Sequence, residues 1–442
     1  MVTKLNAPTR ALTHDALALG LAKGSLRPGS RTAWAGLTSL ALAALAPTFA
    51  SAQGINGARP PAAVGGADRP FTIGVQEITT YDSNPARGST FGSDLRGLQK
   101  DEIILSPSVT VGYSRSVGLQ GVALTGVFGY DDYTKNHNLS TEHIDFSAAA
   151  NRAVGGRCSV NANTQFSRGQ SSLQNVVINV SKDTIQTYSV GAGESCATAT
   201  GFTESVQVNH SGTHNSDDTL VNLNNTGISG SLGYSTHAIG NVGLVVSYNR
   251  TNYVDVPLTS VGTPDSLNVL SFGLQISRPI GSRLSGNAAV FYSHSTQDLR
   301  AGELGDSSYS GITASAGLTY LLGPRIRLSA DLERAVTGSI LQDVGYQITN
   351  SADLTANYTV SSRISASLGG SWSRNSYRGR VVVAPLETPD WQEVANVFGS
   401  VSMQLGRRAA VSLELRHEKG SADIDLYDYT SNRVSLTLSS SI

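Results

Sequence analysis

The sequence predicts an all-β protein, a single transmembrane antiparallel up-and-down β-barrel of about 18 strands that follows a cleaved signal peptide. Three observations lead to this fold. Segments of roughly 10–15 residues alternate apolar with small or polar side chains from residue 71 onward. Tight connectors between these segments alternate with longer ones. After residue 53, no apolar run approaches the roughly 20 residues that a transmembrane helix requires.

Composition agrees with this fold. Charged residues make up 15% of the chain and hydrophobic residues 39%, below the roughly 25% and 45–50% of soluble domains. The formal net charge of −1 removes bulk attraction to nucleic acid, so no nucleic-acid partner is expected. Two cysteines are too few for a dense disulfide scaffold or a four-cysteine zinc site.

The amino-terminal residues differ in composition from the rest. Residues 1–52 combine a basic segment, an apolar run over 33–46 and the small-residue site Ala50-Ser51-Ala52, which predicts a secretory signal peptide. A single amino-terminal membrane anchor is the alternative. Residues 53–70 are rich in Pro, Gly and Ala without periodicity, and we expect a flexible periplasmic lead-in there. The barrel is then expected over 71–442.

The alternation places the expected strands as follows: 71–81, 103–116, 119–134, 140–153, 158–171, 182–197, 201–213, 222–235, 240–253, 265–279, 283–298, 307–322, 325–335, 345–359, 362–377, 391–405, 409–420 and 428–441. Short periplasmic turns, long extracellular loops and an even strand number are typical of an outer-membrane barrel. The bacterial outer membrane is therefore the expected location.

One face of each expected strand is polar and predicts the barrel lumen. An 18-stranded barrel is too wide for side chains to fill, so we expect a water-filled channel. The larger side chains predicted to line it are Gln207, Asn209, Gln275, Asn287, Arg327, Asp331, Glu333, Asp353, Arg363, Glu414 and Arg416.

Aromatic residues in phase with the apolar face predict two girdles at the membrane–water interfaces. Outer-membrane lipid and lipopolysaccharide are the partners expected around them. The residues just before short turns are Tyr113, Tyr234, Tyr320 and Tyr358, and those near long loops are Tyr130, Tyr248, Tyr292 and Trp372.

The longest connector, 82–102, is the candidate for a plug or constriction loop. It carries a mixed set of charges that could line a narrow opening or face solvent, and we favour the solvated interpretation. These residues are Arg87, Asp94, Arg96, Lys100, Asp101 and Glu102.

Cys158 begins one expected strand and Cys196 ends the next, with their midpoint inside the connecting loop. In adjacent antiparallel strands the two residues should face each other at a distance that a disulfide can span. An exported protein meets oxidising conditions. We therefore predict a disulfide that fixes the register of this hairpin at its periplasmic end, with two free thiols as the alternative.

Two histidine clusters are candidates for a catalytic or metal site: His210 and His214 with Asp217 and Asp218, and His137 and His143 with Glu142 and Asp145. No G-x-S-x-G or H-E-x-x-H motif accompanies them. The acidic residues Asp423, Asp425 and Asp428 could bind a divalent cation, but solvated loop residues are the simpler interpretation. We expect no enzyme activity, no metal and no cofactor.

The segment Tyr81-Asp82-Ser83-Asn84-Pro85-Ala86-Arg87 resembles the opening Y-D-x-N-x-x-R motif of the putative β-barrel porin 2 family, and Gly129-Tyr130-Asp131-Asp132-Tyr133 is similar to a later stretch of it. The resemblance implies an outer-membrane conduit for exopolysaccharide or capsule, served by a periplasmic polysaccharide-export lipoprotein. The alternative is a general or substrate-selective diffusion porin for small hydrophilic solutes. An adhesin or structural barrel has less support, because no loop exceeds 21 residues.

Overall fold

The structure is a computed structural model, and it describes residues 70–171, 182–217, 220–254, 265–298, 308–341, 344–379 and 389–441. The predicted signal peptide, the predicted lead-in up to residue 69 and Ile442 lie outside the described residues. Within the described ranges, no helix is long and apolar enough to cross a membrane.

In the described part of the chain, eighteen strands form a single antiparallel sheet. Their bounds are β1 (Phe71–Asp82), β2 (Glu102–Val117), β3 (Gln120–Tyr133), β4 (Thr141–Val154), β5 (Cys158–Gln170), β6 (Thr184–Ala197), β7 (Phe202–Asn215), β8 (Asn222–Thr236), β9 (Gly240–Val254), β10 (Ser266–Ile280), β11 (Leu284–Asp298), β12 (Tyr309–Leu322), β13 (Ile326–Thr337), β14 (Tyr346–Thr359), β15 (Ile364–Arg378), β16 (Trp391–Gln404), β17 (Ala409–Ala422) and β18 (Tyr429–Ser441).

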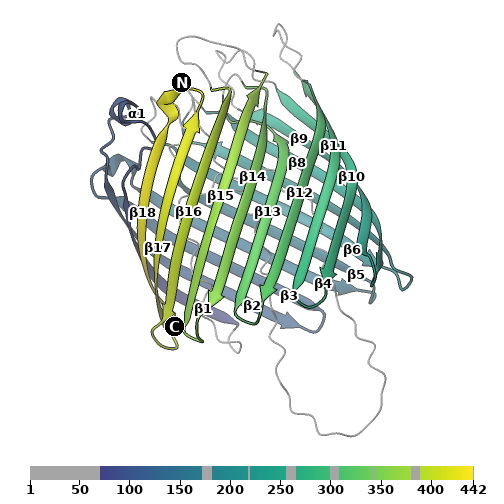
Figure 1. Cartoon of the computed structure of the whole chain (residues 1–442). Helices are drawn as coiled ribbons and strands as arrows, with labels where there is room; N and C mark the ends of the chain where they lie inside the picture. The colour runs from purple at the N-terminus through teal and green to yellow at the C-terminus, as the bar shows by residue number, and fades with distance from the viewer. Residues whose placement is uncertain are drawn as a thin grey trace.

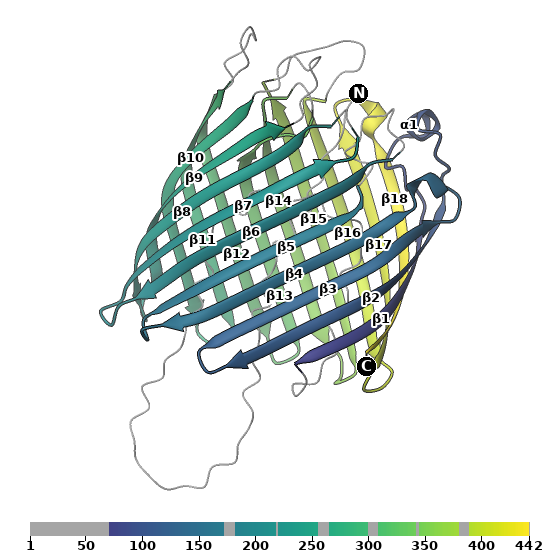
Figure 2. The same ribbon diagram turned by 180° about the vertical axis from the view of Figure 1, so that it is seen from behind.

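Each strand pairs with its neighbours in the sequence, and β1 also pairs with β18, so the sheet closes into a barrel (Figures 1 and 2). At the closing seam, Gly74 lies opposite Ser441 and Asp82 opposite Arg433. The predicted all-β barrel of 18 strands is confirmed, and the predicted strand ends agree with the structure to within two residues.

The connectors at the two barrel ends differ. At one end the turns are short, and some use glycine in the left-handed region, such as Gly155 at φ 60° and Gly156 at φ 71°. At the other end, the connectors carry the short helices α1 (Thr90–Leu95), η1 (His137–Leu139) and η3 (Asp425–Tyr427). Since outer-membrane barrels keep short turns in the periplasm, we refer to this second end as the extracellular mouth.

Candidate functional site

The two faces of each strand differ in chemistry. On β9, the side chains of Leu244, Val246 and Tyr248 are exposed on the outside of the barrel. Ser247 and Asn249, which alternate with them along the strand, point inward and are buried. Paired residues of an antiparallel sheet lie on the same face, so the register extends this assignment from strand to strand. The outer wall is therefore apolar between the two rims, and the wall of the lumen is polar.

Ten of the eleven residues predicted to line the lumen lie in strands, on the face opposite the exposed apolar side chains. They are Gln207, Asn209, Gln275, Asn287, Arg327, Asp331, Glu333, Asp353, Glu414 and Arg416. Arg363 requires a correction. It lies exposed in the turn before β15, because that strand begins only at Ile364.

Asparagine amides lie flat against glycines of the neighbouring strands on the lumen wall. A Cβ atom built on Gly227 would come within 2.5 Å of Asn209 Oδ1, and one built on Gly317 within 2.8 Å of Asn287 Oδ1. The same arrangement recurs for Asn151 on Gly121, Asn163 on Gly191 and Asn161 on Gly193. These pairs give the wall a neutral polar surface of low relief.

Hydroxyl groups continue this neutral surface. Ser293 Oγ lies 2.7 Å from both Ser271 Oγ and Thr313 Oγ1, which links three strands across the lumen wall. Ser205 and Ser231 make a similar contact at 2.7 Å. Because the hydroxyls bond to one another, they remain satisfied without a bound ligand.

The lumen wall carries charged side chains on β13, β14 and β17. Arg416 pairs with Glu414 at 2.9 Å and lies over the inward-pointing Phe398 ring, 5.4 Å from its centre. On β13 and β14, Asp331 lies directly opposite Asp353 in the register. Sequence reasoning did not single out Phe398, although its position between the outward-facing Val397 and Gly399 follows the same alternation.

The first extracellular loop, 83–101, is fixed inside the mouth by a buried ionic network. Arg87 donates two hydrogen bonds to Asp82, at 3.0 and 2.8 Å, and its Nε lies 3.0 Å from Glu418 Oε1. Arg87 also donates to Ser431 Oγ at 2.9 Å, and Arg433 reaches Asp82 Oδ2 at 3.2 Å. The loop is therefore tied to β1, β17 and β18 at the closing seam.

The structure corrects the expectation of a solvated loop for Arg87, Arg96 and Glu102, whereas Asp94, Lys100 and Asp101 are exposed. Arg87 is 4% exposed, Arg96 6% and Glu102 0%. Burial by itself would lower the pKa of Arg87, but Asp82 and Glu418 raise it above its ordinary value, so the guanidinium stays charged. Arg87 adopts φ 48°, an uncommon conformation for a non-glycine residue, within the turn that returns its side chain to Asp82.

Glu102 joins the first loop to the connector 134–140. Its carboxylate accepts hydrogen bonds from Thr134 Oγ1, Lys135 N and Asn136 N at 2.8–3.0 Å. Asn136 then accepts a hydrogen bond from Gln99 N at 2.8 Å, on the first loop. The two connectors therefore form one hydrogen-bonded unit.

Other connectors meet over the mouth through apolar contacts. Leu220 packs in one buried cluster with Ala86, Leu98 and Leu139. The next residue, Val221, donates its backbone N–H to Ile340 O at 3.1 Å, although β8 and β13 are five strands apart in the sheet. A further cluster joins Leu341 and Val344 to Tyr377 and Tyr427. The described connectors thus narrow the extracellular mouth.

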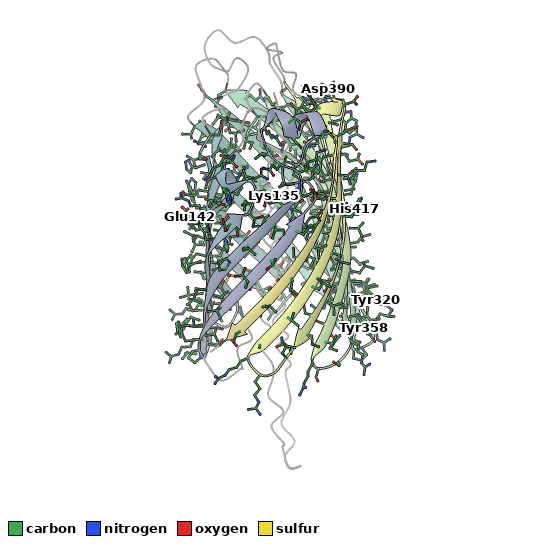
Figure 3. The ribbon with its side chains drawn as sticks, turned by 90° about the vertical axis from the view of Figure 1, so that its left-hand side faces the viewer. Lys135, Glu142, Tyr320, Tyr358, Asp390 and His417 are labelled. Atoms are coloured by element: carbon green, nitrogen blue, oxygen red, sulfur yellow. A yellow bond between two sulfur atoms is a disulfide. The ribbon has the colours of Figure 1, made fainter. Side chains whose placement is uncertain are left out.

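The predicted girdle residues lie on the outer face, but Tyr248, Tyr292 and Trp372 are each the ninth residue of a 15-residue strand and lie near mid-strand rather than near a rim. Tyr320 and Tyr358 lie toward the end with short turns, below Glu142 and His417 on the outer wall (Figure 3). Tyr113 and Tyr234 occupy matching positions at the ends of β2 and β8, and Tyr130, Tyr248, Tyr292 and Trp372 occupy the upper halves of their strands.

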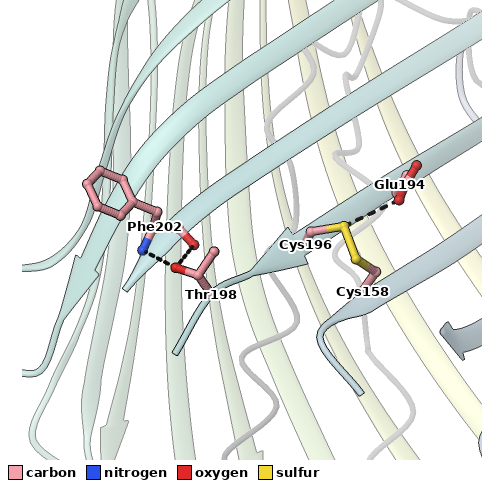
Figure 4. The surroundings of a disulfide bond; sticks show 5 residues. All are labelled: Cys158, Glu194, Cys196, Thr198 and Phe202. Carbon is pink, nitrogen blue, oxygen red and sulfur yellow. Dashed lines mark hydrogen bonds between the residues drawn. A yellow bond between two sulfur atoms is a disulfide. The ribbon is translucent and has the colours of Figure 1, made fainter. Parts of the chain in front are cut away.

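A disulfide joins Cys158 and Cys196, which lie opposite each other in the β5–β6 register, at the end with short turns (Figure 4). The next turn is closed by Thr198, whose Oγ1 accepts a hydrogen bond from Phe202 N at 2.9 Å. These contacts fix the periplasmic ends of three consecutive strands.

Among the described residues, neither histidine cluster forms a group of side chains that could hold a metal ion. His210 and His214 point outward from β7 and contact the Tyr188 ring. The centre of the His210 ring lies 5.8 Å from the centre of the Tyr188 ring, and the centre of the His214 ring lies 6.1 Å from it. His143 instead points into the lumen and lies 2.9 Å from Asp131, whereas its neighbour Glu142 faces outward. Asp218 lies outside the described residues.

The acidic residues of the last extracellular loop bond to backbone amides. Asp423 accepts from Asp390 N at 2.8 Å, and Asp428 accepts from Ala422 N at 2.9 Å. Their carboxylates therefore stabilise the ends of β16 and β17 rather than converging on a common point.

Comparison with known protein families assigns the chain. Residues 75–441 match the family described as putative beta-barrel porin 2. This protein belongs to that family. The match includes the Tyr-Asp-x-Asn-x-x-Arg segment, so the resemblance seen in the sequence is confirmed, and the structure explains the motif. Its Asp82, Asn84 and Arg87 bond to one another and fix the first loop.

Two solved structures are similar to this porin-family chain over most of its length. The FrpB iron transporter from Neisseria meningitidis (F5-1 variant) is 8% identical, with a TM-score of 0.45, and the match covers 80% of this chain and 64% of that one. OccK2 (OpdF) from Pseudomonas aeruginosa is 12% identical, with a TM-score of 0.43, over 84% and 98%. This barrel thus spans less than two thirds of the FrpB chain. No curated protein sequence matches it. Family and fold place the chain in the bacterial outer membrane.

Proposed function

We propose that this barrel is the outer-membrane conduit through which a bacterium exports exopolysaccharide. The observation that carries the proposal is the neutral lumen wall, in which asparagine amides lie flat on glycines and hydroxyls bond to one another. A hydrated glycan presents hydroxyls of its own, so it can exchange weak hydrogen bonds along such a wall without being held at one point.

The inward aromatic rings of the described strands lie mostly near the mouth, where Tyr253, Tyr377 and Tyr429 are buried, and their scarcity below it supports the same function. Phe291 is 5% exposed in a small cluster with Val245 and Ala289, and Phe398 lies beneath Arg416. Neither ring offers an open platform on which a sugar could stack. A binding protein for carbohydrate would hold its ligand, whereas an export conduit has to release each segment of polymer.

Export also requires the extracellular mouth to open. The ionic network of Arg87 and the apolar contacts of the connectors hold the mouth in a narrowed state. We propose that a periplasmic polysaccharide-export lipoprotein delivers the polymer, and that displacement of these connectors accompanies its passage. The barrel itself carries out no chemical reaction in this scheme.

The test uses deletion of the gene and complementation with wall variants. The variant N161W/N209W/N287W places three bulky side chains in the lumen, and V160W/V208W/A288W places the same side chains on the outer face of the same strands. Secreted polysaccharide and entry of a small hydrophilic antibiotic are measured in parallel. We expect deletion and the inward variant to reduce secretion, and the outward variant to restore it.

The same experiment distinguishes the second candidate, a diffusion porin for small hydrophilic solutes. If the protein is a diffusion porin, deletion of its gene should leave polysaccharide secretion unchanged and should reduce antibiotic entry. That result, with the inward variant also blocking entry, would overturn the export proposal. The amount of each variant in the outer membrane is measured in the same cells, so that poor assembly is not mistaken for a blocked lumen.

A further inference from the structure

The outer wall carries a regular series of basic side chains just above its apolar band. On each of seven ascending strands, an Arg or His residue lies two positions after an outward-facing apolar or aromatic side chain. These residues are Arg168, His210, Arg250, His294, Arg334, Arg374 and His417, on β5, β7, β9, β11, β13, β15 and β17. We call this set the basic belt.

The descending strands supply mostly amides and hydroxyls between the members of the belt. His294 Nδ1 lies 2.7 Å from Ser310 Oγ, and His417 Nδ1 lies 2.7 Å from Asn432 Oδ1. Arg334 donates to Ile312 O at 3.1 Å and to Asn350 Oδ1 at 2.8 Å. These contacts orient the basic groups along the surface without neutralising them.

Carboxylates are also present at this level. Glu142 pairs with Arg168 at 2.9 Å, Asp298 lies 3.9 Å from Arg250, and Asp132 and Glu393 face outward nearby. Among the arginines of the belt, Arg334 contacts neutral groups in the described part of the chain, whereas Arg374 lies over the Trp391 ring at 4.6 Å and opposite Glu393 in the register.

The belt lies at the membrane boundary. The apolar residues Val290 and Leu332, both more than half exposed, lie a few positions below it on β11 and β13. Figure 3 shows Glu142 and His417 at a similar height on the outer wall, well above Tyr320 and Tyr358. A lipid whose acyl chains cover the apolar band would therefore place its headgroup against the basic belt.

We propose that the basic belt, centred on Arg334 between β11 and β15, binds the phosphate groups of lipopolysaccharide in the outer leaflet. Arginine matches phosphate oxygens with a planar set of N–H donors, and the neighbouring amides and hydroxyls can bond to the sugar groups that carry the phosphates. The expected mature chain is net acidic, with 27 basic against 32 acidic residues after residue 52. The basic belt is therefore a local concentration of positive charge and does not reflect the net charge of the protein. The site is independent of what passes through the lumen.

The test uses the purified protein in detergent, titrated with rough lipopolysaccharide and followed by the rise in its thermal unfolding temperature. Each basic group near an anionic lipid surface contributes about a fivefold change in affinity. We expect R250Q/R334Q/R374Q to need roughly a hundredfold more lipopolysaccharide for the same rise. Lipopolysaccharide stripped of its phosphates should bind wild type and variant equally weakly.

R152Q is the matched control, because Arg152 is an exposed arginine on the outer face of β4 near the opposite rim. It should bind lipopolysaccharide as wild type does. Each variant is first shown to unfold at the wild-type temperature without added lipid. The proposal is overturned if the triple variant binds like wild type, if R152Q loses as much affinity, or if removal of the phosphates has no effect.

Discussion

Replacement of Arg87 by Ala should release the first extracellular loop from the mouth of the barrel. The guanidinium lies 2.8 Å from Asp82 and 3.0 Å from Glu418, and the Arg87 and Asp82 side chains are almost completely buried. Loss of the cation leaves Asp82 and Glu418 as buried carboxylates with reduced compensation. Removal of one partner from such a pair costs about 3–5 kcal/mol.

That cost applies to the docked state of the loop, because in the released state Asp82 and Glu418 can regain water. The equilibrium between docked and released loop should therefore shift toward release by a factor of about 10² to 10⁴. The apolar cluster of Ala86, Leu98, Leu139 and Leu220 opposes release. Its members are small or medium-sized, so it should retain some of the loop in place.

The assay is single-channel conductance of the purified barrel in planar bilayers. We expect Arg87→Ala to increase the fraction of time spent in high-conductance states. Lys100→Ala is the matched control, because Lys100 lies exposed on the same loop and donates a hydrogen bond to Thr90 Oγ1. If Arg87→Ala and wild type show the same conductance and open fraction, then the ionic network does not narrow the mouth and the reasoning fails.

Three further predictions concern stability. C158S/C196S removes a link that closes 38 residues and should lower the free energy of unfolding by about 4 kcal/mol, measured by urea titration against the disulfide-bonded wild type; an unchanged urea midpoint would contradict it. Leu244→Arg places a charge on the lipid face and should destabilise the barrel by about 2–4 kcal/mol, whereas Gln207→Arg in the lumen should cost under about 1 kcal/mol; equal costs would show that the two faces are misassigned. Glu102→Ala removes the acceptor for the connector 134–140 and should speed proteolysis there, and an unchanged cleavage rate would count against that role.

The strands could be predicted closely because their signal is local. Alternation has a period of two, so an outward Leu244 fixes the inward direction of Val245 without any tertiary information. The pairing of Cys158 with Cys196 could be predicted for the same reason, because the register of a single hairpin follows from the position of its own turn. The prediction that Arg363 lies on the lumen wall of a strand was wrong, because the boundary between turn and strand depends on hydrogen bonds that the alternating pattern does not specify.

The sequence by itself determined the barrel, its strand number, the two faces of its wall and its membrane location, because each of these follows from short-range periodicity in a chain that must satisfy its backbone within lipid. Only the tertiary structure decided the state of the mouth. Arg87 meets Glu418 across 331 positions of the chain, and Val221 meets Ile340, so closure of the barrel had to bring these partners together. The sequence of a charged loop does not show whether its side chains face water or a buried carboxylate, because residues distant in the sequence become partners only when the chain has folded.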